Sequence, residues 1–174
     1  MKDNTTILTI ITYAVLLTAV SVLLNDIREF DLQQFEEFRN WSKTANKNES
    51  WFTSKNLIKW AYYVTSAGLF FWRGYLIYGF SHFLFILREV DKGHYFSDKN
   101  IASFKKIGKI FIAYTVNIIV LRFLLSIIEN SAHNFFKVLK TDFLLLIPCA
   151  LAFYILAEIF KRAKETKEEN DLTI

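Results

Sequence analysis

Residues 60–87 read WAYYVTSAGLFFWRGYLIYGFSHFLFIL, and Arg73 is the one charged residue among them. An apolar run of about 18 or more residues is long enough to cross the ~30 Å hydrocarbon core of a bilayer as an α-helix. The stretch is therefore predicted to be a transmembrane helix. Because it is longer than that minimum, we also expect it to be tilted in the membrane.

Three further apolar runs indicate that the whole chain is a membrane protein. Each carries at most one charge: residues 5–25 none, residues 110–128 Arg122, and residues 143–160 Glu158. Hydrophobic residues make up 53% of the 174 residues and come in blocks, which leaves no room for a separate soluble domain. The sequence predicts an all-α integral membrane four-helix bundle, a single domain over residues 1–174 with spans at 5–25, 60–87, 108–128 and 143–160 and a tail at 161–174.

The lysines and arginines predict how this bundle is oriented. Four spans put both termini on one side of the membrane, and the cations nearest to span ends lie in the loop 88–109 and in the tail 161–174. Such cations mark the cytoplasmic side. Both termini are therefore predicted to be cytoplasmic, in a multi-pass protein of the inner (plasma) membrane. The net charge of +4 follows from these flanking residues, so we expect no direct contact with nucleic acid.

The loop between the first two spans carries an apolar pattern of its own. Apolar side chains recur at roughly helical spacing at Ile27, Phe30, Phe35, Phe38 and Trp41. This pattern predicts an amphipathic helix over about residues 27–42, on the extracytoplasmic side. Such a helix either caps the bundle or lies on the outer lipid surface.

Two arginines within the apolar runs are the costliest residues of the chain. Arg73 falls near the middle of its run, where an arginine costs at least about 2.5 kcal/mol, and Ser66 shares its helical face. Arg122 is shallower and shares a face with Glu129. Neither arginine has an obvious acidic partner inside the membrane. Two readings stay open: a polar cavity at Arg73, Arg122, Ser66 and Glu129 that takes an anionic ligand, or satisfaction by hydroxyls, backbone carbonyls and water.

No pattern of catalytic or metal-binding residues stands out. The three histidines, His82, His94 and His133, have no metal-ligand spacing. The zinc-protease motif H-E-x-x-H, the nucleophile motif G-x-S-x-G and a phosphate-binding glycine loop are absent from the sequence. We therefore expect neither enzyme activity, nor a cofactor, nor a metal.

Two segments outside the spans carry a family resemblance. GHYFSDKNIASFKKIGKIF at 93–111 and LAEIFKRAKETKEENDLTI at 156–174 together resemble the bacterial four-span membrane proteins known as domain of unknown function 2975. The matching positions are Gly93, Phe96, Ser97 and Asn100 in the first segment and Glu158, Phe160, Glu169, Asp171, Leu172 and Thr173 in the second. These motifs cover about a fifth of the chain, and both are predicted to lie on the cytoplasmic side.

The resemblance implies a partner rather than an activity. Genes of this family often adjoin a short helix-turn-helix regulator, which implies a membrane partner for a cytoplasmic transcription factor. A non-enzymatic signalling or interaction protein, embedded in the lipid bilayer, is thus the first hypothesis. The alternative is a small transporter, exporter or immunity component with a polar pathway at Arg73 and Arg122. That alternative requires a homo-oligomer, because four spans are few for a monomeric carrier.

Overall fold

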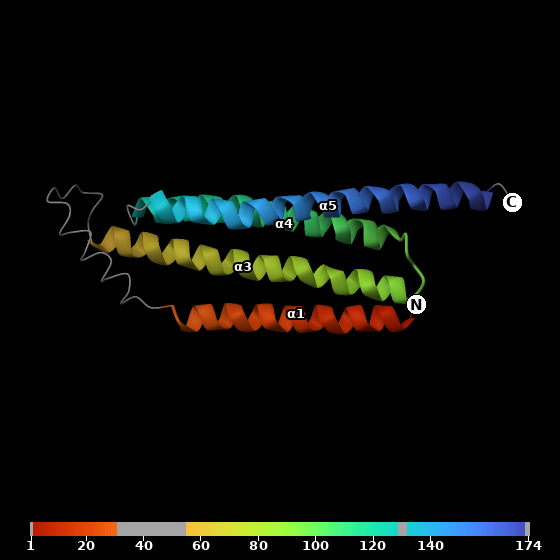
Figure 1. The fold of residues 1–174 in the computed structure, drawn as a ribbon, viewed down its shortest axis with the longest axis horizontal. Coiled ribbons are helices and arrows are strands. Elements are labelled where there is room, and N and C mark those ends of the chain that lie inside the picture. Colours follow the sequence, from red (N-terminus) through yellow and green to blue (C-terminus); the bar gives the residue numbers. More distant parts are fainter. Residues whose placement is uncertain (1, 31–54, 129–131, 173–174) are drawn as a thin grey trace.

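The chain is built of long helices. The computed structural model describes residues 2–30, 55–128 and 132–172, and within these ranges the chain is α-helical except at residues 29–30 and at the turn 92–97. The helices are α1 (Lys2–Arg28), α3 (Lys55–Asp91), α4 (Asp98–Ile128) and α5 (Ala132–Leu172) (Figure 1). The predicted all-α class is confirmed.

Three of these helices are long and apolar enough to cross a membrane. They contain the segments Asn4–Arg28, Trp60–Asp91 and Asp98–Ile127, which agree with the first three predicted spans. The fourth predicted span, 143–160, is helical within α5 and remains a prediction as a membrane span. Of the amphipathic helix predicted at 27–42, residues 31–42 lie outside the described ranges.

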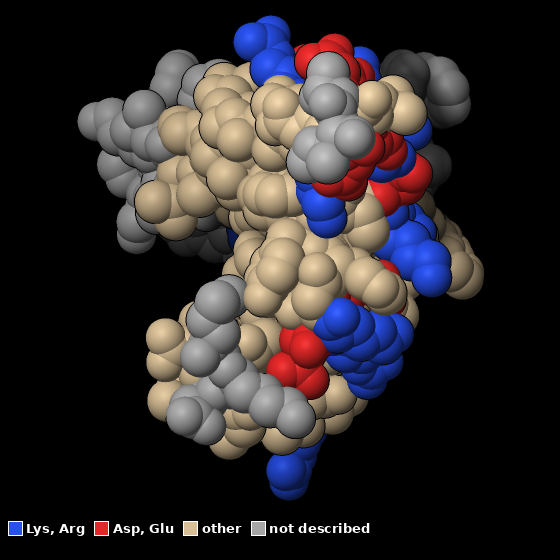
Figure 2. All heavy atoms as spheres, turned by 90° about the vertical axis from the view of Figure 1, so that its right-hand side faces the viewer, with Lys and Arg blue, Asp and Glu red and all other residues tan. Residues whose placement is uncertain are grey.

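Successive helices run in opposite directions, so Lys2 and Leu172 come to the same end of the molecule (Figure 1). Helix α3 packs on α4 and α4 packs on α5, whereas α1 packs on α3 alone. Figure 2 views the end that carries both termini and shows a hollow between α1, in the lower part, and α4 and α5, in the upper part. In the described ranges, the four helices thus form a three-helix core with α1 added along one side, more open than the bundle that we expected.

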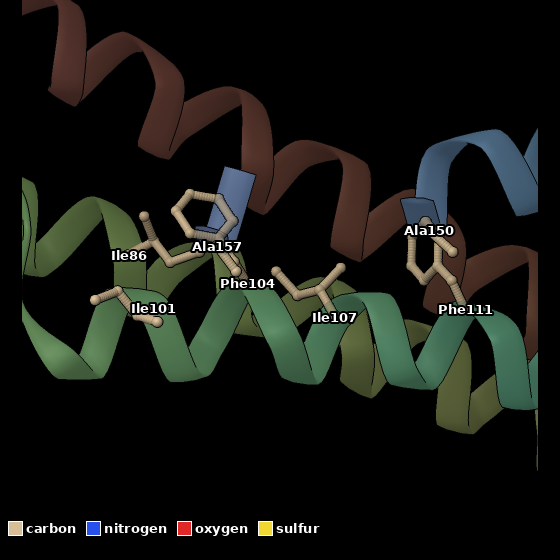
Figure 3. Close-up of a cluster of buried hydrophobic side chains, with 7 residues drawn as sticks. All are labelled: Ile86, Ile101, Phe104, Ile107, Phe111, Ala150 and Ala157. Carbon is tan, nitrogen blue, oxygen red and sulfur yellow. The ribbon is translucent and has the colours of Figure 1, made fainter. Parts of the chain in front are cut away.

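The core lies where α3, α4 and α5 meet. Its buried residues are Ile86, Ile101, Phe104, Ile107, Phe111, Ala150 and Ala157. Figure 3 shows Phe104 beside Ala157 and Phe111 beside Ala150. Two alanines seven residues apart lie on one face of α5, and such small residues let neighbouring helices approach closely. The aromatic rings of α4 therefore fill the space that the alanines leave.

Helix α3 packs tightly on α4 at Gly79, which gives a testable prediction. A Cβ atom at position 79 would lie 2.6 Å from Ile110 Cγ2, whereas one at Gly74 would lie 3.9 Å from Leu23. We expect Gly79→Ala to lower the free energy of unfolding by about 1.5 kcal/mol through overpacking. The matched variant Gly74→Ala should be neutral or gain up to about 1 kcal/mol from helix propensity.

Thermal unfolding in detergent micelles, followed by circular dichroism, compares these two glycine variants. Equal shifts in midpoint for Gly79→Ala and Gly74→Ala would show that α3 and α4 are not packed closely at position 79.

Candidate functional site

The arginine side chains of α3, Arg73 and Arg88, point toward α1. Arg73 Nη1 donates to Asp26 Oδ2 and forms an ion pair with it. No acidic partner for Arg73 was expected within the membrane spans, and the structure supplies one from just beyond the first of them. Asp26 follows the charge-free run 5–25 immediately, and the antiparallel packing of α1 on α3 brings it level with Arg73. Both side chains are partly exposed, 40% for Arg73 and 34% for Asp26.

We call the line of contacts between α1 and α3 the seam. Further contacts extend it in both directions from the Arg73–Asp26 pair. Toward the end with the termini, Arg88 Nη2 donates to Tyr13 Oη over 3.3 Å. Toward the other end, the Phe30 ring stacks on Tyr62 at 5.7 Å and meets Phe70 edge-on at 5.7 Å. Arginine side chains and aromatic rings of α3 therefore hold α1 in register.

Arg122 occupies different surroundings. It follows the buried Thr115 by seven residues, about two turns, and so lies on the same inward face of α4. Its Nε atom is buried and has no hydrogen-bond partner among the described residues. Arg73, by contrast, pairs with Asp26 of α1.

The remaining members of the predicted polar cavity are only partly described. Ser66 is buried on α3, about two turns from Arg73 on the same face. Glu129 lies outside the described residues. Arg73 contacts α1, whereas Arg122 lies on the inward face of α4, and the cavity expected from these four residues stays a prediction.

At the carboxyl end of α3, Gly93 and backbone hydrogen bonds make a tight turn. Gly93 has a φ of +82°, in the left-handed region that favours glycine. The Gly93 N–H donates to the Val90 carbonyl over 3.0 Å, and the His94 N–H donates to the Glu89 carbonyl over 2.9 Å. This arrangement is a common way to end a helix.

Ser97 and Asn100 then start α4. Ser97 Oγ accepts the Asn100 N–H over 3.2 Å, as an N-cap does. Asn100 is fully buried, and its Nδ2 donates to the carbonyls of His94 and Tyr95 over 2.9 and 2.8 Å. Three of the four motif residues in this segment therefore have a structural role in the turn.

The fourth, Phe96, joins the turn to α5. The Phe96 ring meets Phe160 edge-on at 5.4 Å, and Phe104 meets Phe160 at 5.0 Å. One turn of helix beyond Phe160, Lys164 Nζ donates to Asp98 Oδ2 over 2.7 Å. This hydrogen bond and the charge of Asp98 raise the pKa of Lys164 above its ordinary value.

We call the turn 92–97, the start of α4 and α5 from Phe160 onward the family end, because both motif segments meet there. Glu158 pairs with Arg162 over 3.6 Å, and Glu169, Asp171 and Leu172 lie on the exposed last turns of α5. Thr173 lies outside the described residues. In the described parts of the chain, His, Cys, Asp and Glu form no group of three that could hold a metal ion.

Comparison with known proteins gives one match. A family model described as protein of unknown function (DUF2975) matches residues 44–174. The matched range contains α3, α4, α5 and both motif segments but not α1, so the resemblance does not extend over the whole chain. No curated protein and no solved structure matches. Since the match covers three quarters of the chain, the protein belongs to the DUF2975 family.

Proposed function

We propose that this protein is a non-enzymatic interaction protein of the bacterial plasma membrane. Its partner in this proposal is a cytoplasmic helix-turn-helix regulator, which it holds at or releases from the membrane. The observation that carries the proposal is the meeting of both family motif segments at one end of the molecule. The pair Asp98–Lys164 and the edge-on rings of Phe96 and Phe160 join them.

The last turns of α5 supply the docking surface in this proposal. Lys164 is the point where Asp98 holds α5, and residues 165–172 beyond it are exposed. Eight helical residues extend about 12 Å. The tip is Leu172, which is 87% exposed. An apolar residue at the end of a charged helix is suited to docking in a groove of a partner protein.

Deleting residues 165–174 tests this proposal, because it removes the tip and keeps the Asp98–Lys164 contact. A full-length chain with an amino-terminal tag is purified in mild detergent and tested with purified helix-turn-helix regulator. We expect the full chain to bind it and the deletion to lose at least tenfold in affinity.

A matched control replaces residues 165–174 by a glycine-serine segment of the same length and should behave like the deletion. Binding that is unchanged in both variants would rule out the tip as the docking surface. Equal circular dichroism spectra per helical residue show that the remaining helices are intact.

The transport or immunity alternative ranks second. Its polar pathway needed both Arg73 and Arg122, but Asp26 already meets the charge of Arg73. The buried Nε of Arg122, which lacks a hydrogen-bond partner among the described residues, is the observation that still favours it.

A further inference from the structure

The cations near the family end fall into two groups. On α5, Lys161, Arg162 and Lys164 each pair with a carboxylate, respectively Glu165, Glu158 and Asp98. On α4, Lys105, Lys106 and Lys109 form no ion pair with a described carboxylate, and neither does Arg88 of α3. Cations without an internal acidic partner are free to take an external anion.

Lys106 is held beside an aromatic stripe of α3. Its Nζ donates to Tyr78 Oη over 2.9 Å and lies 5.1 Å from the centre of the Tyr78 ring. Phe71, Tyr78 and Phe85 follow one another at seven-residue spacing, so they share one face of the helix, and all three are exposed. Arg88 closes the stripe with its guanidinium 5.9 Å from the Phe85 ring.

A buried histidine lies within the same stripe. The His82 ring meets Tyr78 edge-on at 5.1 Å and Phe85 at 5.5 Å. His82 is only 9% exposed, and its Nε2 is buried without a hydrogen-bond partner among the described residues. A polar atom buried in this way costs free energy unless a further group bonds to it.

We propose that this face of α3 and α4 binds an anionic phospholipid. The phosphate accepts hydrogen bonds from Lys106 Nζ and the Tyr78 hydroxyl, and the buried His82 ring packs against Tyr78 behind them. One acyl chain lies along the exposed rings toward Phe71, while Arg88 lies at the polar end. From Tyr78, beside Lys106, to Phe71 the face changes from polar groups to an apolar ring, as a phospholipid does from headgroup to tail.

The proposal rests on the proposed membrane placement and is independent of any regulator. Full-length protein in mild detergent is mixed with equal amounts of dioleoyl phosphatidylglycerol and dioleoyl phosphatidylcholine, and lipid adducts are counted by native mass spectrometry. We expect preferential binding of phosphatidylglycerol. Lys106→Gln should weaken it roughly fivefold, the effect of one lysine near an anionic lipid surface.

The control is Lys161→Gln, which removes the same charge from a cation that already pairs with Glu165; its affinity should equal that of the wild type. Tyr78→Phe keeps the ring and removes the hydroxyl, and it should also weaken binding, so it decides the matter if Lys106→Gln fails to fold. Equal binding of both lipids by the wild type would overturn the proposal, as would equal affinities in Lys106→Gln and Lys161→Gln. If excess inorganic phosphate displaced the lipid, the site would be one for free phosphate, and the proposal of a phospholipid site would be wrong.

Discussion

Replacing Asn100 by aspartate is expected to lower the free energy of unfolding by about 3 kcal/mol at neutral pH. The two side chains have the same shape, but the aspartate places an oxygen where the Asn100 Nδ2 now donates to the carbonyls of His94 and Tyr95. Both hydrogen bonds are lost, and a carboxylate is left fully buried against two acceptors. The turn 92–97 should then separate from α4, and Phe96 should leave Phe160.

The pH dependence distinguishes this effect from a loss of packing. A protonated aspartic acid can donate one hydrogen bond, so the Asn100→Asp variant should regain part of its stability as the pH falls. The exposed change Asn170→Asp on α5 is the control and should stay within about 0.5 kcal/mol of the wild type. Thermal unfolding in detergent micelles at several pH values measures both. An Asn100→Asp variant as stable as the wild type would mean that this amide does not hold the turn together.

Replacing Asp26 by asparagine is expected to lower the free energy of unfolding in a bilayer by about 2.5 kcal/mol. The change leaves Arg73 without its carboxylate in a low-dielectric environment, where an unpaired arginine is costly. The double variant Asp26→Asn with Arg73→Leu should recover most of the loss, because it removes the unpaired charge as well. A double-mutant cycle in lipid nanodiscs gives the coupling free energy of the pair.

Glu29→Gln supplies the control for this cycle. Glu29 lies three residues after Asp26, just beyond the end of α1, and accepts a hydrogen bond from Asn25. Its replacement therefore changes the charge by the same amount but leaves the pair with Arg73 intact. We expect a change below about 0.5 kcal/mol. Additive effects of the Asp26 and Arg73 substitutions would show that the two side chains do not interact in the bilayer.

Much of the fold could be predicted from run lengths. Apolar runs with at most one charge each indicated the first three membrane-length helices. These signals are local, since they depend on the propensity and length of one segment. The motif residues of the family end could be recognised for the same reason, because each falls in a short segment with a distinct pattern.

The pairing of Arg73 could not be predicted from the runs alone. Asp26 lies just beyond the first run, and only the register between α1 and α3 shows that it reaches the middle of α3. An almost entirely apolar helix also carries no pattern that says how many neighbours it packs on, so the open side at α1 was not foreseen. The stripe of Tyr78, His82 and Lys106 depends in the same way on the packing of α3 against α4.

Helix α5 continues without a break from Ala150 to Leu172. Ala150 packs close to Gly108 of α4, where a Cβ on the glycine would lie 3.1 Å from the Ala150 carbonyl oxygen. From Ala150 to the tip at Leu172 the helix rises about 33 Å. A tilt of about 5° at this contact therefore displaces the tip by about 3 Å, the length of a hydrogen bond. A change of that size in how α5 lies on α4 would be large enough to make or break a contact at the tip.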